Sequence, residues 1–248
     1  MKRLLLLLVF LPVRGFSPVL FDGVNDMVGF GACGDSMLRE QGQTYTISAL
    51  IMPLTLGESS LGTIVRRGAL QFRLNNSDEI TMRIAGSTTL MSTCVAGCIV
   101  TNTWSHVLVT GDGTTNFTGI HIYVNGAEIS YGSTANGVTL TDNSADPIII
   151  GNNDAGTVSF NGQISEVAVW TSVLTAAQIA ALYNGRGVHG TPLQTSFSTL
   201  QAYWPLDDFG DGTALSGTGT VHDRSVNAFN GSQTNGPIGK ASSIVSYP

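Results

Sequence analysis

Apolar and polar residues alternate along most of the chain from residue 17 to about residue 170, and Gly, Asn and Asp interrupt the alternation repeatedly. A period of two is typical of a strand that buries one face and exposes the other. The pattern therefore predicts a succession of short strands joined by turns. The predicted strands span residues 44–54, 62–68, 70–75, 79–86, 104–113, 119–130, 146–152 and 160–170.

The turns between these strands favour antiparallel pairing. Asn125 and Gly126 separate two alternating runs, which is the strongest local pattern for a β-hairpin. The spacing of the strands argues for a sandwich rather than for βαβ units. We therefore expect an all-β fold of antiparallel sheets.

One segment has helical features instead. Thr175 is a good N-cap residue, and Gln178 three residues later completes a capping-box pattern. Gly185 then allows the left-handed turn that ends a helix. We predict one short helix near residues 175–184 that lies against an edge of the sandwich.

The tail beyond about residue 188 is rich in loops. It contains one clear strand, at 200–208, and one polar loop, at 222–231. The tail is too short to fold alone, so we expect its strands to join the same sandwich. Residues 16–248 are thus predicted to form a single domain.

Composition supports an all-β domain and argues against one class of partner. Charged residues make up 11% of the 248 residues, against about 25% in ordinary soluble domains, while the hydrophobic fraction is 42%. This mixture suits strands and turns rather than a helical or disordered protein. The net charge is −6 and the sequence contains no basic stripe, so nucleic acid is not expected as a partner.

Residues 1–15 are predicted to be a signal peptide or a hydrophobic arm. Lys2 and Arg3 precede an apolar run from Leu4 to Val13, and a small residue suitable for cleavage, Gly15, follows. The run is a secretory pattern and too short for a membrane-spanning helix. The alternative is an uncleaved arm that docks on a partner chain. We expect an extracellular or secreted protein without a membrane span.

The chain has three cysteines. Cys94 and Cys98 flank a short turn and could form a disulfide if the protein is exported. Cys33 would then be left over as a small buried hydrophobic residue. The cysteines and histidines show no zinc-site spacing.

A set of motifs follows one another in a recognisable order. They are FDGVNDMVGF, YTISALIMP, TIVRRG, WSHVLVTGDGTTNFTGIHIYVNG and IIIGNNDAGTVSFNGQISEVAVWTSVLTAAQIAALYN. This order resembles the laminin-G-like domains of the concanavalin-A-like lectin/glucanase superfamily. The tail segments AYWPLDDFGDGT and DRSVNAFNG also look like this family, where they usually precede the FDG motif. The chain therefore looks permuted, and the resemblance covers residues 17 to about 235.

The resemblance implies a jelly-roll β-sandwich of two antiparallel sheets, with the concave sheet and its loops as the binding surface. It also implies a non-catalytic, lectin-like carbohydrate-binding or adhesion module, secreted or surface-exposed, whose partner is a glycan or a surface glycoprotein. The alternative is a structural decoration or attachment protein of a virion or extracellular assembly, with neighbouring protein chains as partners. Its motivation is the low charge, the many turns and the hydrophobic N-terminus.

Two polar loops are candidate calcium sites, because Ca²⁺ is bound by several carboxylate, amide and carbonyl oxygens. One surrounds Gly23, and the other has oxygen-bearing side chains at alternate positions. The resemblance implies that such loops help to hold a structural calcium ion. Glu166 could add a carboxylate, although Ser165 stands where the family usually has Asp. The alternative is that these residues only hold turns. The candidate ligands are Asp22, Asn25, Asp26, Glu166, Asp223, Ser225 and Asn227.

A sugar site needs polar groups beside an exposed aromatic ring. Tyr131 is a candidate ring, with Phe117 and Tyr45 as alternatives. The polar groups would come from the loop that contains Asn152, Asn153 and Asp154. The three tryptophans, Trp104, Trp170 and Trp204, lie within strand patterns and are expected in the core.

The sequence does not predict an enzyme. Glucanases of this superfamily place paired carboxylates on one strand, usually as E-x-D-x-x-E. No glutamate of the chain starts that pattern, and no GxSxG motif supports a serine hydrolase.

Overall fold

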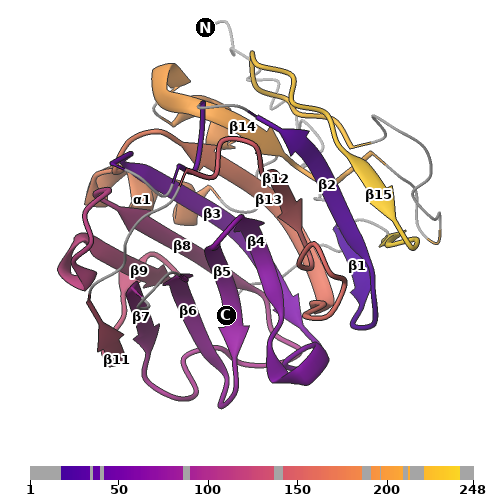
Figure 1. Cartoon of the computed structure of the whole chain (residues 1–248), viewed down its shortest axis with the longest axis horizontal. Helices are drawn as coiled ribbons and strands as arrows, with labels where there is room; N and C mark the ends of the chain where they lie inside the picture. Colours follow the sequence, from indigo (N-terminus) through magenta and orange to yellow (C-terminus); the bar gives the residue numbers. More distant parts are fainter. Residues whose placement is uncertain are drawn as a thin grey trace, which may run out of the picture.

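The computed structural model describes residues 18–33, 36–39, 42–85, 90–136, 142–185, 191–195, 197–208, 212 and 221–240. These residues form two antiparallel β-sheets packed face to face, with short helices beside them (Figure 1). The predicted jelly-roll sandwich is confirmed. Residues 1–15, predicted to be a signal peptide or an arm, lie outside the described residues.

Sheet A is organised around β13. Its strands follow the order β10-β9-β8-β3-β13-β1-β16, and β14 also pairs with β13. One edge of β13 pairs with β3, whereas β1 and β14 follow each other along its opposite edge. The strands of sheet A are β1 Val19–Asp22, β3 Tyr45–Pro53, β8 Ser105–Gly111, β9 Ile120–Val124, β10 Ala127–Glu128, β13 Asn161–Trp170, β14 Leu200–Trp204 and β16 Ile238–Gly239.

Sheet B has the order β11-β7-β6-β5-β4-β12-β2-β15. Its strands are β2 Met27–Ala32, β4 Thr63–Arg67, β5 Leu70–Asn75, β6 Glu79–Ile84, β7 Leu90–Cys94, β11 Tyr131–Ala135, β12 Pro147–Ile150 and β15 Ser232–Thr234. The tail therefore contributes strands to both sheets, as predicted, because β14 and β16 belong to sheet A and β15 to sheet B.

The predicted hairpin and helix are both present. Asn125 and Gly126 have positive φ angles of 51° and 80° and connect β9 to β10. The helix α1 spans Ala176–Asn184, and its N-cap Thr175 forms the expected capping box with Gln178. The other helical segments are α2 Thr191–Gln194 and the 3-10 turns Glu58–Ser60, Phe117–Gly119 and Phe197–Thr199.

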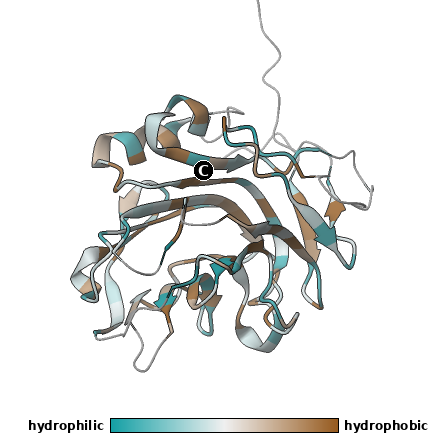
Figure 2. Ribbon diagram, turned by 45° about the horizontal axis from the view of Figure 1, so that its top comes forward, coloured by the Kyte–Doolittle hydropathy of each residue, from teal (hydrophilic) through white to brown (hydrophobic). Residues whose placement is uncertain are grey.

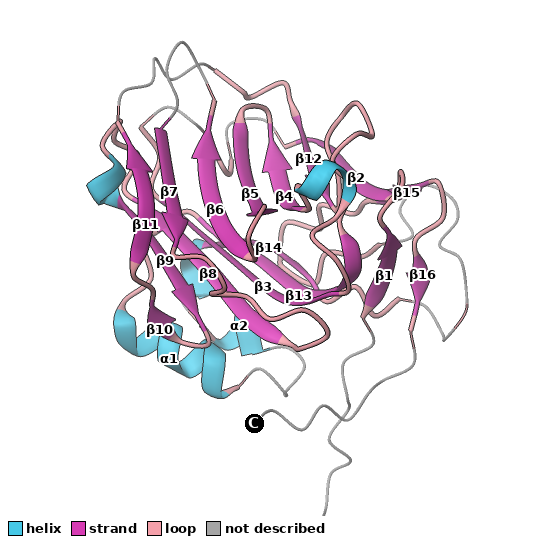
Figure 3. Ribbon diagram, turned by 90° about the horizontal axis from the view of Figure 1, so that it is seen from below, coloured by secondary structure: helices cyan, strands magenta, loops and turns pink. Residues whose placement is uncertain are grey.

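The two sheets differ in what covers their outer faces. β5 alternates between buried and partly exposed residues, whereas every residue of β8 is buried. The reason is that α1, α2 and the chain around them pack on the outer face of sheet A (Figures 2 and 3). The side chains of this second apolar cluster are Leu108, Ala168, Trp170, Leu174, Ile179, Leu182, Leu200 and Tyr203.

The main apolar core lies between the sheets. It includes Phe21, Phe72 and Trp204, which are fully buried. The predicted burial of the tryptophans is confirmed, since Trp104 is 7% exposed and Trp170 and Trp204 are not exposed at all. Each fully buried side chain of this size stabilises the fold by roughly 1.5–3 kcal/mol.

One glycine of β13 leads to a test of the sheet A register. Gly162 has a φ of 142°, and a Cβ there would lie 2.3 Å from the carbonyl oxygen of Met52 on β3. Because that obstacle is backbone, Gly162→Ala should reduce the free energy of unfolding by at least about 2 kcal/mol. Gly29→Ala is the matched control, since a Cβ at Gly29 of β2 has no heavy atom within 4 Å. Chemical denaturation would measure both, and equal stabilities would contradict this register.

Candidate functional site

The turn after β1 is held by its own polar side chains. The main-chain N–H of Val24 donates to Oδ1 of Asp22 (2.8 Å), and that of Asp22 donates to Oδ2 of Asp26 (2.9 Å). Asn25 is exposed, and its carbonyl accepts a hydrogen bond from the amide of Asn235 (3.0 Å). The FDG motif therefore forms an Asx-type turn, the alternative left open by its sequence.

Asp26 has an oxygen that this turn does not use. The residue is only 2% exposed, and its Oδ1 makes no hydrogen bond to any described residue. Burial, and after it the charge of the neighbouring Asp22, raises the pKa of the Asp26 carboxyl to about 6, although the bond from the Asp22 amide lowers it. Two adjacent carboxyls, one of them with a buried unpartnered oxygen, favour binding of a proton or a cation.

The second predicted calcium loop is occupied by internal hydrogen bonds. The carboxylate of Asp223 is 7% exposed and accepts four of them, at 2.8 to 2.9 Å. The amide of Asn227 donates to the carbonyl of Gln201 on β14, and the hydroxyl oxygen of Ser225 lies 3.0 Å from the same carbonyl. The alternate spacing of these residues thus ties the loop to β14. The donors to Asp223 are the main-chain N–H groups of Tyr203, Ser225 and Phe229 and the Ser225 hydroxyl.

The two loops lie far apart along β13. Asp22 is opposite Asn161, whereas Tyr203, whose N–H binds Asp223, is opposite Ala168. Residues 161 and 168 are seven positions apart on an extended strand, a separation of roughly 20 Å. One calcium ion therefore cannot take ligands from both loops.

Glu166 belongs to neither loop. It lies at a bulge of β13 with a φ of 53°, and its Oε2 accepts a 2.5 Å hydrogen bond from the hydroxyl of Tyr203. The side chain is 7% exposed and lines a small, partly open pocket between sheet A and the helices. In the same pocket Oγ of Ser48 lies 2.9 Å from Nε2 of His106. The other lining residues are Leu50, Leu182, Gly185, Thr191 and Pro192.

This pocket offers one carboxylate, that of Glu166. The two-carboxylate mechanism of glycoside hydrolysis needs a second one at roughly 5–10 Å. The pocket therefore lacks the acid pair of a glucanase site within its described lining.

The predicted sugar-binding loop follows β12. Asn152 is fully buried, and its Oδ1 accepts from the main-chain N–H groups of Asn153 (2.8 Å) and Val158 (3.1 Å). The Asn153 side chain bonds Thr157 within the same loop. The Nδ2 of Asn152 also donates to the carbonyl of Asp26 (3.3 Å), and Asp154 lies 3.5 Å from the guanidinium of Arg66 on β4. The two asparagines hold the loop, and Asp154 stays available at the surface.

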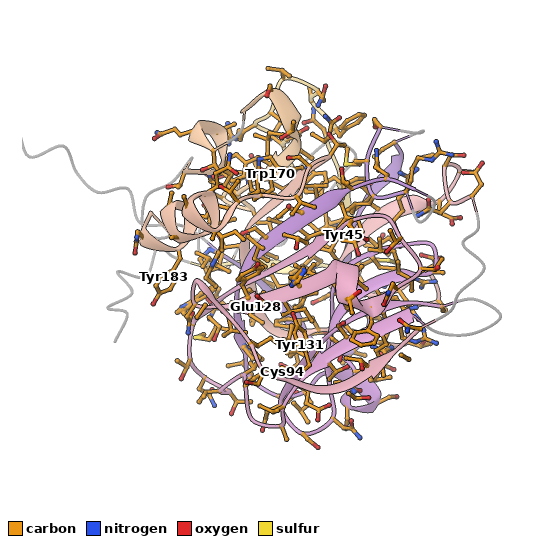
Figure 4. All side chains as sticks on the ribbon, turned by 90° about the vertical axis from the view of Figure 1, so that its left-hand side faces the viewer. Tyr45, Cys94, Glu128, Tyr131, Trp170 and Tyr183 are labelled. Carbon is orange, nitrogen blue, oxygen red and sulfur yellow. A yellow bond between two sulfur atoms is a disulfide. The ribbon has the colours of Figure 1, made fainter. Side chains whose placement is uncertain are left out.

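Tyr131 does not form an exposed platform. Its ring packs against the main core, and its hydroxyl accepts from the N–H of Ile122 (3.1 Å) on β9 and donates to Glu128 (2.9 Å). Figure 4 shows Tyr131 between Glu128 and Cys94. Tyr131 thus connects the edges of the two sheets. The face of its ring that packs against the core is not accessible to a sugar.

Cys94 and Cys98 are joined by a disulfide, with a sulfur–sulfur distance of 1.96 Å. The bond closes the loop after β7, and the Cys94 sulfur also accepts a hydrogen bond from the N–H of Ile80 on β6. Cys33 is a free, buried thiol.

The open outer face of sheet B carries charged residues that the sequence analysis missed. Arg66 on β4, Gln71 on β5 and Arg83 on β6 lie directly opposite one another, and Arg73 lies one pleat further along β5. We call these four residues, three arginines and Gln71, the arginine row. The alternation within LQFRLN and EITMRI puts Gln71, Arg73 and Arg83 on outward positions, but only the pairing of the strands brings them together.

Comparison with known families and structures agrees with this fold. The family model Laminin_G_3, described as the concanavalin A-like lectin/glucanases superfamily, matches residues 25–180, more than half of the chain. No match is found among curated proteins.

Solved structures of similar fold come from several organisms. A crystal structure of a candidate carbohydrate binding protein from Bacteroides ovatus ATCC 8483 has a TM-score of 0.59 and 22% identity. The match covers 92% of this chain but 60% of that protein, so the chain spans less than two thirds of its length. At this identity the similarity establishes the fold alone.

Two further structures are less similar. The heptameric SAP-like pentraxin of Limulus polyphemus has a TM-score of 0.46 and 18% identity, over 72% of this chain and 86% of that one. Domains LG4-5 of the mouse laminin alpha1 chain have a TM-score of 0.43 and 14% identity, over 62% and 41%. Both TM-scores are below 0.5, so nothing further is inferred from them.

The titration of Asp26 predicts how stability depends on pH. The ordinary pKa of its carboxyl is 3.8, and the folded state raises this pKa to about 6. The folded chain therefore keeps a proton over a pH range in which the unfolded chain has released it. Ionisation of Asp26 accordingly destabilises the fold more and more as the pH rises from about 4 to about 6.

Asp26→Asn removes this ionisation and keeps an oxygen for the Asp22 amide. In calcium-free buffer, the melting temperature of the variant relative to the unmodified protein should rise through this window and level off above about pH 6.5. Thermal melts of both proteins over a pH series would measure the difference. A difference that stays constant from acidic to neutral pH would contradict this role of Asp26.

Proposed function

The chain belongs to the Laminin_G_3 family of the concanavalin A-like lectin/glucanases superfamily, and on that premise we propose that it is a non-catalytic, lectin-like carbohydrate-binding or adhesion module. The binding surface is the outer face of sheet B together with the loop 151–157. This choice is supported by the difference between the outer faces of the two sheets. Helices bury the outer face of sheet A, whereas every second side chain of β5 in sheet B is partly exposed.

The proposal is consistent with the polar character of that face. Gln71, Arg73 and Arg83 are all partly exposed on it, and Asp154 borders it next to Arg66. Sugars are recognised by a few such hydrogen-bonding groups on a preformed surface. The candidate carbohydrate binding protein from Bacteroides ovatus, whose fold is similar over 92% of this chain, supports the same function.

We also propose an extracellular location. The disulfide between Cys94 and Cys98 supports it, because disulfides persist in oxidising compartments. Among the described helices, none is long and apolar enough to cross a membrane. The alternative, a structural protein of a virion or extracellular assembly, depends on the N-terminal arm, which lies outside the described residues.

A structural calcium ion is the second part of the proposal, now limited to the turn after β1. Asp26 would supply its unpartnered Oδ1 and Asp22 a neighbouring carboxylate. No group of three or more His, Cys, Asp or Glu side chains gathers anywhere in the described part of the chain. The remaining ligands would therefore be carbonyl or amide oxygens, such as that of Asn25, and water, which calcium accepts readily.

Carbohydrate binding can be tested on a glycan array with the purified chain. We expect binding to a defined group of glycans and no release of sugar from them, since the proposed surface is non-catalytic. The heat-denatured chain is the control. Absence of binding to every glycan, or release of reducing sugar that depends on the protein, would overturn the proposal.

Calcium binding can be tested by thermal melts. At a calcium concentration about a hundred times its Kd, the melting temperature should rise by about 5–10 °C over that in chelator. Asp26→Asn should lose this rise, while Asp154→Asn, which changes an acid outside the turn, should keep it. An equal melting temperature in calcium and in chelator would exclude the ion.

A further inference from the structure

The arginine row gathers positive charge on one face of an acidic protein. The chain has a net charge of −6, yet Arg66, Arg73 and Arg83 lie on three adjacent strands of sheet B. Strands are roughly 4.8 Å apart, so the row from β4 to β6 spans roughly 10 Å of the open face. Three of the 11 Lys and Arg residues of the chain therefore lie close together on this face, with Glu79 and Asp154 as acids on or beside it.

Two guanidinium groups of the row share one neutral acceptor. Nη1 of Arg73 and Nη1 of Arg83 both donate to Oε1 of Gln71, at 3.0 and 3.4 Å. Within the described residues, no carboxylate lies within ion-pair distance of either arginine, whereas Arg66 pairs with Asp154 at 3.5 Å. Two like charges thus meet at an amide oxygen that neutralises neither of them.

Arg73 also has an unsatisfied donor. Its Nε is buried and makes no hydrogen bond to a described residue. Burial, and after it the charge of Arg83, lowers the pKa of the Arg73 guanidinium. Because this Nε is buried, a ligand on the surface would meet the Nη groups of Arg73, and a negative charge placed there would favour the charged form of the guanidinium.

We propose that the arginine row is a binding site for acidic glycans, with carboxylate or sulfate groups of the sugar accepting hydrogen bonds from Arg73 and Arg83. This inference rests on the proposed carbohydrate-binding function and specifies the class of glycan. The amide of Gln71 orients both guanidinium groups and can bond a sugar hydroxyl. Arg66 and Asp154 lie at one end of the row and can contact the next sugar unit.

The shape and the charge of the face favour a glycan over other anions. A row that crosses three strands suits an extended oligosaccharide with separate anionic groups better than a single small anion. Nucleic acid is disfavoured, because its affinity depends on neutralising many phosphates and the chain is acidic outside the row. Guanidinium groups also match the planar geometry of carboxylates and the oxygens of sulfates.

The experiment compares acidic glycans with matched neutral ones. The probes are oligosaccharides that contain sialic acid or uronic acid, sulfated oligosaccharides, and the carboxyl-reduced and desulfated forms of the same chains. We expect the acidic forms to bind at least about tenfold more tightly, and the affinity to fall as salt rises. The two acidic series distinguish carboxylate from sulfate recognition.

Variants locate the site. Arg73→Gln and Arg83→Gln should each weaken binding of acidic glycans by about tenfold, and Arg73→Lys should have a smaller effect because it keeps the charge. Arg224→Gln is the matched control, since Arg224 is an exposed arginine near Asp207 and Asp208 whose main-chain N–H bonds Tyr203 on β14 of sheet A. Melting temperatures of all variants report whether they fold.

The outcomes separate this inference from the proposed function. Binding of neutral and acidic forms with equal affinity would overturn the inference and leave carbohydrate binding intact. Acidic glycans that bind folded Arg73→Gln and Arg83→Gln as tightly as the unmodified chain would overturn the assignment to the row. Binding to no glycan of either kind would overturn the proposed function and this inference together.

Discussion

Burial of the outer face of sheet A is the constraint on which the rest of the molecule depends. Trp170, Leu182 and Tyr203 form an apolar cluster between that face and α1, so β3, β8 and β13 are covered on both sides. The polar residues caught there must find partners inside the protein. Ser48 and His106 do so with each other, and Glu166 with Tyr203. Along the described central strands, the outer face of sheet B is therefore open, whereas the outer face of sheet A is covered.

The same need for hydrogen-bond partners explains why many predicted ligand residues are structural. Buried main-chain groups have to be satisfied, and Asp and Asn side chains satisfy them in tight turns. Asp223 and Asn152 are used in this way, each by main-chain N–H groups of its own loop. Among the candidate calcium ligands, all of which lie in the described part of the chain, Asp26 is the one with a buried side-chain oxygen that makes no hydrogen bond. The same sequence pattern can therefore form a structural turn or a ligand site. The two differ in how many side-chain oxygens remain without a hydrogen-bond partner inside the turn.

The strands of the C-terminal tail lie beside the first strands of the chain in both sheets. β16 pairs with β1 and β15 pairs with β2, so the tail strands occupy the places beside the first two strands. β14 extends the line of β1 along β13. Strands that are neighbours in space can stand at either end of a chain, which is why the permuted order is compatible with the family's fold.

The sequence by itself determined the fold class, the hairpin at Asn125-Gly126, the capped helix and the buried tryptophans. These features depend on local periodicity and on residues close together in the chain, which a single sequence displays. Tertiary structure decided the candidate sites. It separated Asp22 from Asp223 by roughly 20 Å along β13, and it brought Arg66, Gln71, Arg73 and Arg83 together from three strands. Such distances depend on strand order and register, which arise from long-range pairing and are not written in any local pattern.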